Sequence, residues 1–297
     1  MDVEKRESQI ALVVPVYNGE RFLRSLLESV KAQTFGNWLC ICVDDGSTDG
    51  SLAILNEFAE IDGRFVVAAQ RNAGCGAARN AAIAMANAPF VMFADQDDVL
   101  HPRCFECALA LMQRTDADAV CFKAVPFAET FEPPALPTKL DDIQIRRRGL
   151  PPGDQFVQGG TGCSIFVWRH IFRRSAIADV LFPPLSGGED AVWMVELGWR
   201  NVNIVDASVV LYGNRHHADS GSRGLSRRYI DNVFRSYVEM RERGVRYGID
   251  DGLMRRFLFR LAFWFVASAY YHGLRSGFYA TRLFLRGQWR KGELVAG

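Results

Sequence analysis

The chain has 297 residues, of which 49% are hydrophobic and 23% charged; this is the composition of an ordinary globular protein with apolar material for one large domain or two modest ones. Its seven cysteines are scattered through apolar segments, which indicates reduced thiols in a cytoplasmic protein and argues against a disulfide framework. Residues 1–9 are polar and charged, so we expect no secretory signal peptide there. We expect no nucleic-acid partner.

The charge is unevenly divided along the chain, although the net charge is only +1. Residues 223–297 carry 15 Lys and Arg against 6 Asp and Glu, a net charge of +9, so residues 1–222 carry −8. This asymmetry indicates an anionic partner for the C-terminal part, either a membrane surface or an acidic substrate.

The first part of the chain, up to about residue 120, alternates between predicted strands and predicted helices. Each strand is a short apolar run bounded by turn residues, and each helix carries its apolar residues on one stripe. The strands are expected at 9–16, 38–43, 65–69 and 89–93, and the helices at 20–31, around 52–58 and after 72–80. Buried-type strands that alternate with helices predict an α/β fold with a parallel, Rossmann-like sheet and helices on both faces.

The rest of the chain has a less regular pattern. Residues 126–153 predict a long loop, and its run Arg146-Arg147-Arg148 is interpreted as a solvated face, with an anion site as the alternative. Other elements are expected in the following places: strands at 119–125 and 202–211, a helix at 169–178, a helix that opens at 187–190, and helices at 227–243 and 253–286.

The most hydrophobic segment is 257–271, which Arg260 interrupts. Its uninterrupted part, 261–271, is too short to span a bilayer. We therefore expect a helix that packs on the core or on a partner, such as a second copy of the chain in a homodimer. A helix lying in the plane of the membrane surface is the alternative, because the flanks are basic and aromatic residues are many.

Polar side chains follow each of the first four predicted strands. Tyr17 follows the first, Asp44 and Asp45 the second, Asn72 the third, and Asp95 and Asp97 the fourth. The ends of consecutive parallel strands meet at one edge of a sheet, and ligands of open α/β sheets bind there. We therefore expect these side chains to share one cleft.

The most acidic of these strand ends is Asp95-Gln96-Asp97-Asp98. Like charges this close repel one another unless a cation neutralises them. A hard divalent cation such as Mg²⁺ uses one or two carboxylates together with the phosphates of a substrate. The run therefore predicts a metal–diphosphate site, and an acidic turn that caps the next helix is the alternative.

Four strings in this part of the chain resemble the family 2 glycosyltransferases of the GT-A fold. They are VVPVYN at 13–18, VDDGSTD at 43–49, NAG at 72–74 with ARN at 78–80, and FADQDD at 93–98. Their order and spacing match the family over residues 1–105 or thereabouts. The glycines do not match the dinucleotide-binding fingerprint, which would place them after the first strand.

The resemblance implies an enzyme that moves a sugar, with inversion, from a nucleotide-diphosphate sugar to an acceptor hydroxyl. A UDP-sugar is the expected donor, and cell-surface polysaccharide or glycolipid synthesis the expected setting. The implied donor-site residues are Pro15 and Tyr17 in the base pocket, Asp45 on the base, Asn72 and Arg79 nearby, Asp95 at the ribose or metal shell, and Asp97 as a ligand of Mn²⁺ or Mg²⁺.

Two short motifs extend the resemblance beyond residue 105. Gly188-Glu189-Asp190 is similar to the family's Glu-Asp element, which implies Asp190 as the catalytic base; a carboxylate that caps a helix is the alternative. The segment 215–220 resembles an element in which a histidine completes the metal or diphosphate site. His217 aligns best, and His216 is its neighbour.

The expected domains are a GT-A catalytic domain at 1–222 and a basic helical extension at 223–297. The catalytic domain divides into a nucleotide-sugar-binding half, 1–123, and an acceptor-side half, 124–222. A saccharide or lipid-linked acceptor is expected, with peripheral contact at the inner face of the membrane. One alternative is a non-catalytic sugar-nucleotide-binding module on the same fold. The other is a nucleotidyltransferase, but that class is expected to have a Gly-rich loop with a basic residue after the first strand, where this chain has Tyr17-Asn18-Gly19-Glu20.

Overall fold

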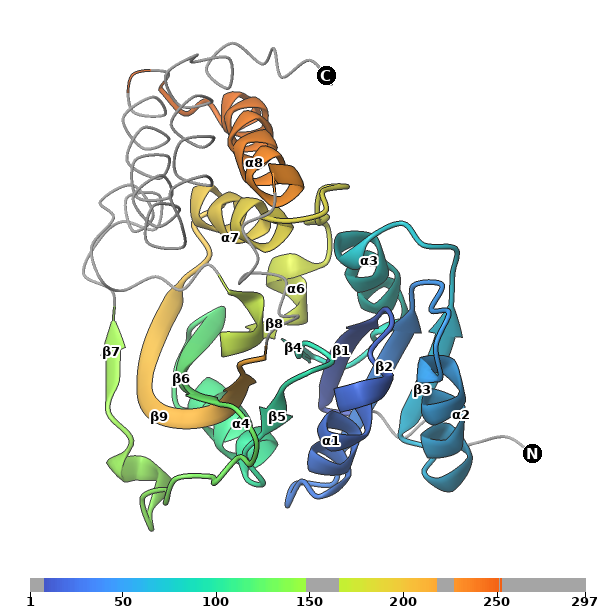
Figure 1. The fold of residues 1–297 in the computed structure, drawn as a ribbon. Helices are drawn as coiled ribbons and strands as arrows, with labels where there is room; N and C mark the ends of the chain where they lie inside the picture. The colour runs from blue at the N-terminus through green and yellow to red at the C-terminus, as the bar shows by residue number, and fades with distance from the viewer. Residues whose placement is uncertain (1–7, 148–165, 218–226, 251, 253–297) are drawn as a thin grey trace. The chain divides into compact units, whose positions relative to one another are not determined.

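The computed structural model describes residues 8–147, 166–217, 227–250 and 252 (Figure 1). They belong to two compact units. The described part of the first unit is 8–147, 166–181 and 203–216, and that of the second is 182–202, 217, 227–250 and 252. The expected boundary between residues 222 and 223 stays a prediction, and the hydrophobic segment 257–271 lies outside the described residues.

Four parallel strands form one part of the sheet in the first unit. In spatial order they are β3 (Phe65–Ala69), β2 (Trp38–Asp44), β1 (Ile10–Val16) and β4 (Phe90–Phe93). Val16 is in register with Asp44, and Asp44 with Ala69, so these strands end at the same edge of the sheet. The four predicted strands and their parallel order are confirmed.

The sheet continues beyond β4 with strands of mixed direction. The further strands are β8 (His170–Arg173), β6 (Ala119–Phe127), β9 (Ile204–Arg215) and β5 (Val99–Leu100), and β7 (Ile145–Arg147) also pairs with β9. β8 is antiparallel to both β4 and β6, whereas β6 and β9 are parallel. Because β5 pairs with β9, the segment between β4 and β5 is held beside the end of β9.

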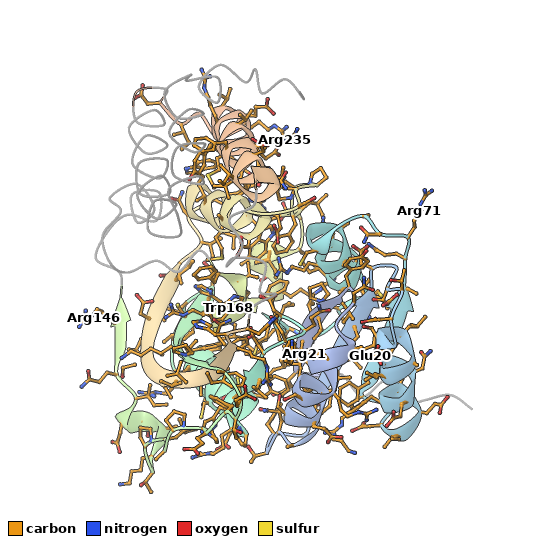
Figure 2. The ribbon with its side chains drawn as sticks, in the orientation of Figure 1. Glu20, Arg21, Arg71, Arg146, Trp168 and Arg235 are labelled. Carbon is orange, nitrogen blue, oxygen red and sulfur yellow. The ribbon has the colours of Figure 1, made fainter. Side chains whose placement is uncertain are left out.

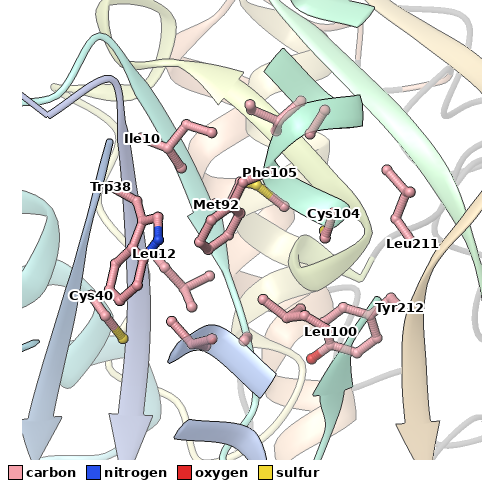
Figure 3. Packing of buried hydrophobic residues seen from close by; sticks show 14 of the residues in the cluster. Ile10, Leu12, Trp38, Cys40, Met92, Leu100, Cys104, Phe105, Leu211 and Tyr212 are labelled. Carbon is pink, nitrogen blue, oxygen red and sulfur yellow. The ribbon is translucent and has the colours of Figure 1, made fainter. Parts of the chain in front are cut away.

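Helices cover both faces of the parallel strands. They are α1 (Glu20–Lys31), α2 (Ser51–Ile61), α3 (Cys75–Met85) and α4 (Cys104–Gln113). Alternate residues of β1, Ile10 and Leu12 among them, pack with α1 and α4 in one buried cluster (Figure 3). The buried residues of α3 lie outside that cluster and α3 packs on β1 and β2, so α3 covers the other face.

Two expectations for the middle of the chain are wrong. The expected helix at 169–178 is instead the 3₁₀ turn Val167–Arg169, strand β8 and the short helix α6 (Arg174–Ile177). The expected loop at 126–153 contains the 3₁₀ turn Leu140–Asp142 and strand β7. Pairing partners distant in sequence impose both strands. Arg146 is exposed on β7 (Figure 2), as its interpretation as part of a solvated face predicts.

The second unit contains α7 (Glu189–Trp199) and α8 (Arg227–Arg246), which confirm the helices predicted to open at 187–190 and 227. The two helices pack against each other. Arg243 of α8 forms ion pairs with Glu196 of α7 and with Glu239, and the Tyr247 hydroxyl donates to Glu196 Oε1 over 2.7 Å. Among the helices that the structure describes, none has the length and apolar run that crossing a bilayer requires.

Candidate active site

The acidic loop, Asp95–Asp98, joins β4 to β5 at the edge where the parallel strands end. Its first three residues are partly exposed, whereas the Asp98 side chain has no exposure to solvent. One loop thus presents carboxylates to solvent and buries another.

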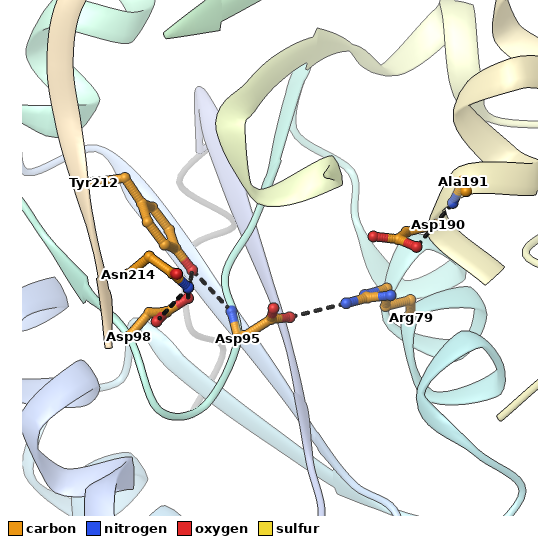
Figure 4. Close-up of polar contacts among 7 residues, drawn as sticks. All are labelled: Arg79, Asp95, Asp98, Asp190, Ala191, Tyr212 and Asn214. Carbon is orange, nitrogen blue, oxygen red and sulfur yellow. Dashed lines mark hydrogen bonds and ion pairs between the residues drawn. The ribbon is translucent and has the colours of Figure 1, made fainter. Parts of the chain in front are cut away.

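Asp98 fixes the acidic loop to the end of β9. Its carboxylate accepts hydrogen bonds from the Tyr212 hydroxyl at 2.7 Å and from the Asn214 side chain at 3.2 Å (Figure 4). It also accepts one from the Arg215 backbone N–H at 2.7 Å. Burial raises the pKa of Asp98 well above its ordinary value, and the charges of Asp95 and Asp97 raise it further. This buried carboxylate is therefore a structural anchor.

Asp95 is connected to two other elements of the first unit. Its Oδ1 is 2.9 Å from Nη2 of Arg79, which projects from α3, and its backbone N–H donates to the Tyr212 hydroxyl over 3.1 Å (Figure 4). The Arg79 side chain is only 4% exposed, whereas Asp95 is 33% exposed. Arg79 is thus a buried cation that orients a half-exposed carboxylate.

Gln96 connects the acidic loop to the turn after β1. Its Oε1 accepts a hydrogen bond from the Tyr17 backbone N–H at 2.8 Å, and its Nε2 donates to the Tyr17 carbonyl at 3.0 Å. The Tyr17 side chain remains 47% exposed. The turn that carries the exposed aromatic ring is therefore joined directly to the loop that carries the carboxylates.

The turn after β2, residues 45–50, is called the β2 turn below. Asp45 is 2% exposed, and its carboxylate accepts three hydrogen bonds of 2.8 Å, from the Gln70 side chain and from the backbone N–H groups of Ala73 and Gly74. Asp45 thus holds the segment between β3 and α3, which carries the exposed Asn72. Gly46 lies beneath this segment with φ of +76°, and a Cβ there would be 2.9 Å from the Asn72 nitrogen.

The β2 turn also exchanges hydrogen bonds with the start of α1. Asp49 accepts from the backbone N–H groups of Glu20 and Ser51, which begin α1 and α2, and Glu20 Oε2 accepts from the backbone N–H of Gly50. The two helix starts thus satisfy each other's free N–H groups. Burial raises the pKa of Asp49, but the hydrogen bonds from the Ser51 hydroxyl and these N–H groups outweigh it, so the pKa lies below its usual value.

Asp95 and Asp97 are the candidate ligands for a divalent cation. Over the residues that the structure describes, no group of three or more His, Cys, Asp or Glu side chains is arranged to hold a metal by itself. Two partly exposed carboxylates are nevertheless the set of hard oxygen donors that Mg²⁺ uses when substrate phosphates complete its coordination. The acidic loop therefore fits a metal that arrives with a diphosphate.

The other predicted site residues lie in three places. Pro15 is buried in β1, two residues before Tyr17. Asp190 lies in the first turn of α7 in the second unit, and its Oδ1 accepts a hydrogen bond from the backbone N–H of Ala191 at 2.8 Å (Figure 4). His217, also in the second unit, is partly buried. His216 ends the first unit and contacts the Asn214 side chain over 3.1 Å.

The structure therefore joins Tyr17, Arg79 and Asp95 through the acidic loop into one hydrogen-bonded framework of the first unit, and Asp45 holds the segment that leads into α3, from which Arg79 projects. Sequence reasoning missed the residues that hold this framework together, namely Gln96, Asp98, Tyr212, Asn214 and Arg215. The available signal was weak: Asp98 was visible as one more carboxylate in the acidic run, and Arg215 only as the residue before two histidines.

Comparison with known sequences assigns the family. The profile of Glycosyl transferase family 2 matches residues 11–181. EpsH of Bacillus subtilis (strain 168), provisionally named a glycosyltransferase, is 32% identical over 240 residues, which cover 78% of this chain and 67% of EpsH. The uncharacterized glycosyltransferase YibD of Escherichia coli (strain K12) is 29% identical over 223 residues, or 73% of this chain and 64% of YibD. The chain belongs to glycosyltransferase family 2, and it spans about two thirds of the length of these two relatives.

Comparison with solved structures identifies the fold. S. aureus TarS in complex with UDP-GlcNAc has a TM-score of 0.66 and 19% identity, over 85% of this chain and 72% of the TarS chain. The mannosyltransferase PcManGT from Pyrobaculum calidifontis, in complex with GDP-Man and Mn²⁺, has a TM-score of 0.57 and 15% identity, over 96% and 76% of the two chains. The predicted GT-A fold is confirmed.

Proposed function

We propose that this protein transfers a sugar from a UDP-sugar to a hydroxyl group of a saccharide or lipid-linked acceptor, with inversion at the anomeric carbon. The observation that carries the proposal is the framework of the first unit, in which Gln96 joins the acidic loop to Tyr17 and Arg79 orients Asp95. An exposed aromatic face can bind a base, and partly exposed carboxylates can bind a ribose and, through a divalent cation, a diphosphate. Family membership supports the same activity.

The nucleoside is assigned to Tyr17, Pro15, Asp45 and Asn72. The ring of Tyr17 is half exposed and offers a face on which a base can stack. The carboxylate of Asp45 has about four acceptor positions, and its three hydrogen bonds to the chain leave one for a donor on the base, such as the ring N–H of uracil. Asp45 would thus hold both the segment that carries Asn72 and the base.

The diphosphate is assigned to the acidic loop. We propose that Asp97 holds Mn²⁺ or Mg²⁺, with Asp95 in the ribose or metal shell and His217 completing the site. A divalent cation bound there would neutralise the charge that develops on the diphosphate leaving group. Arg79 contributes by keeping the carboxylate of Asp95 oriented.

Asp190 is assigned as the general base. It accepts the proton of the acceptor hydroxyl while that oxygen bonds to the anomeric carbon, and the bond from this carbon to the diphosphate oxygen breaks with its electron pair on the diphosphate. A single displacement from the opposite face inverts the anomeric centre. The similarity of Gly188-Glu189-Asp190 to the family's Glu-Asp element supports this role.

The test is a panel of UDP-sugars incubated with Mn²⁺ or Mg²⁺ and saccharide or lipid-linked acceptors of bacterial cell-surface type. Asp190→Asn should lower turnover roughly 10²–10⁴-fold while the affinity for UDP persists. Glu242→Gln, at an exposed carboxylate of α8, is the matched control and should keep full turnover. An Asp190→Asn variant with near full rate would remove Asp190 from the role of base. A wild-type protein that binds UDP but neither transfers nor hydrolyses any donor would instead be a non-catalytic binding module.

A further inference from the structure

Gln96 lies between the two partly exposed carboxylates of the acidic loop, and its side chain bonds to the backbone of another turn. Its amide forms a two-point hydrogen bond with the backbone of Tyr17, through Oε1 at 2.8 Å and Nε2 at 3.0 Å. A side-chain amide can accept from and donate to the backbone of one residue at the same time. The pair thus extends the connection between the ends of β1 and β4 beyond the last residues of those strands.

Gly19 lies so close to this amide that a side chain at Gly19 would overlap it. A Cβ on Gly19 would lie 2.5 Å from Oε1 and 2.6 Å from Cδ of Gln96, and the three nearest atoms that it would meet all belong to Gln96. The backbone of Gly19 has φ of −104°, which any residue adopts, so a side chain at this position would be opposed by the Gln96 amide and not by the backbone conformation. The turn after β1 and the side chain of Gln96 are therefore fitted to each other.

We propose that Gln96 is a positioning residue that sets the distance between the nucleoside contact at Tyr17 and the diphosphate contacts at Asp95 and Asp97. This inference rests on the proposed function and extends it. Two contacts on a rigid frame bind the two halves of one ligand with a high effective concentration, and a loose frame loses that advantage without weakening either contact alone. Gln96 would therefore contribute to the affinity for the joined nucleotide and not to the affinity for its parts.

The experiment compares the affinities of three probes for the full chain by titration: UDP with Mn²⁺, uridine alone, and pyrophosphate with Mn²⁺. In Gln96→Ala, and in Gln96→Met, which keeps the length but not the hydrogen bonds, the affinity for UDP should fall about three- to tenfold. The affinities for uridine and for pyrophosphate should stay within about twofold of wild type. A general structural defect would weaken all three probes together.

A second substitution, at Gly19, should lower the affinity for UDP through the same contact and so gives an independent check. Gly19→Ala should displace the amide of Gln96 and lower the affinity for UDP by about the same factor as Gln96→Ala. The double variant should be no worse than either single variant, because both changes remove one interaction. If the two effects multiply, or if uridine and pyrophosphate weaken as much as UDP does, Gln96 is not a positioning residue.

The failure of this inference differs from the failure of the proposed function. A wild-type protein that binds no nucleoside diphosphate contradicts the proposed function. A wild-type protein that binds UDP, together with Gln96 variants that bind it equally well, contradicts only the role of Gln96.

Discussion

The β2 turn and the acidic loop are two acidic strand ends on either side of β1, and they use their carboxylates differently. In the β2 turn, Asp45 accepts three hydrogen bonds and Asp49 accepts from the first N–H groups of two helices. In the acidic loop only Asp98 is fully enclosed, whereas Asp95 and Asp97 remain partly exposed.

This difference shows that the number of acidic residues at a strand end does not identify a ligand site. Burial and the number of donors that the chain itself supplies separate the two roles. A buried carboxylate that accepts several hydrogen bonds from the chain organises the chain, and Asp45 does so while keeping one acceptor position for the proposed contact with the base. A partly exposed carboxylate next to a fixed cation has more acceptor capacity for a ligand. By this criterion Asp98 belongs with the residues of the β2 turn, although it is adjacent to Asp97.

Replacing Asp98 tests this assignment, and we expect it to have the largest effect on stability. Asp98→Ala should lower the free energy of unfolding by about 3 kcal/mol, because the Tyr212 hydroxyl and the Arg215 N–H lose their acceptor in a buried place. Urea denaturation measures this change. Asp98→Asn is the matched control and should lose less than half as much, since its amide oxygen keeps one acceptor for the buried donors. A loss below about 1 kcal/mol in Asp98→Ala would place Asp98 with the ligand carboxylates instead.

An intermediate effect is expected from the β2 turn. Asp49→Ala should lower the free energy of unfolding by about 1 kcal/mol at neutral pH, the usual effect of removing a helix-capping side chain. The pKa of Asp49 is depressed in the folded chain, so its contribution is present above the unfolded pKa of about 3.9 and is lost as the pH falls through the lower folded value. The difference from wild type should therefore shrink below about pH 4.

The control for Asp49→Ala is Asp141→Ala, at a carboxylate that is 86% exposed in the same unit. It should change stability by less than about 0.5 kcal/mol at any pH. If the stability difference of Asp49→Ala stays constant from pH 7 to pH 3, the mutual capping of α1 and α2 is not what Asp49 provides.

The smallest effect on stability is expected at Asp97. Asp97→Ala should leave the free energy of unfolding within about 0.5 kcal/mol of wild type, because the side chain is partly exposed and its charge lies near both the like charge of Asp98 and the opposite charge of Arg215. The same urea denaturation measures it. A loss as large as that of Asp98→Ala would end the distinction between the two neighbouring residues.

The sequence was sufficient to predict the parallel part of the sheet but not the strands that extend it. β1 to β4 are local apolar runs bounded by turn residues, so each could be identified without its neighbours. β8 has only four residues, and the pattern of Trp168 to Phe172 suits a helix as well as a strand. Its pairing with β4 and β6 decides between them, and that pairing depends on tertiary structure.

The candidate site was predictable to a similar degree. The position of each strand end could be inferred from the order of the elements, which placed Tyr17, Asp45 and Asp95 together. Which carboxylate of the acidic loop is buried could not be inferred, because the partners of Asp98 lie on β9, more than a hundred residues further along the chain. The two-point contact of Gln96 with Tyr17 is likewise invisible in the pattern of residue types.

The most direct test of the central claim is the affinity of wild type, Asp97→Ala and Asp141→Ala for UDP, measured by calorimetric titration with and without Mn²⁺. The account predicts that wild type and Asp141→Ala bind UDP alike and more tightly with Mn²⁺, and that Asp97→Ala loses at least about tenfold in affinity together with its response to the metal. Equal affinity and an equal response to Mn²⁺ in Asp97→Ala and wild type would contradict it.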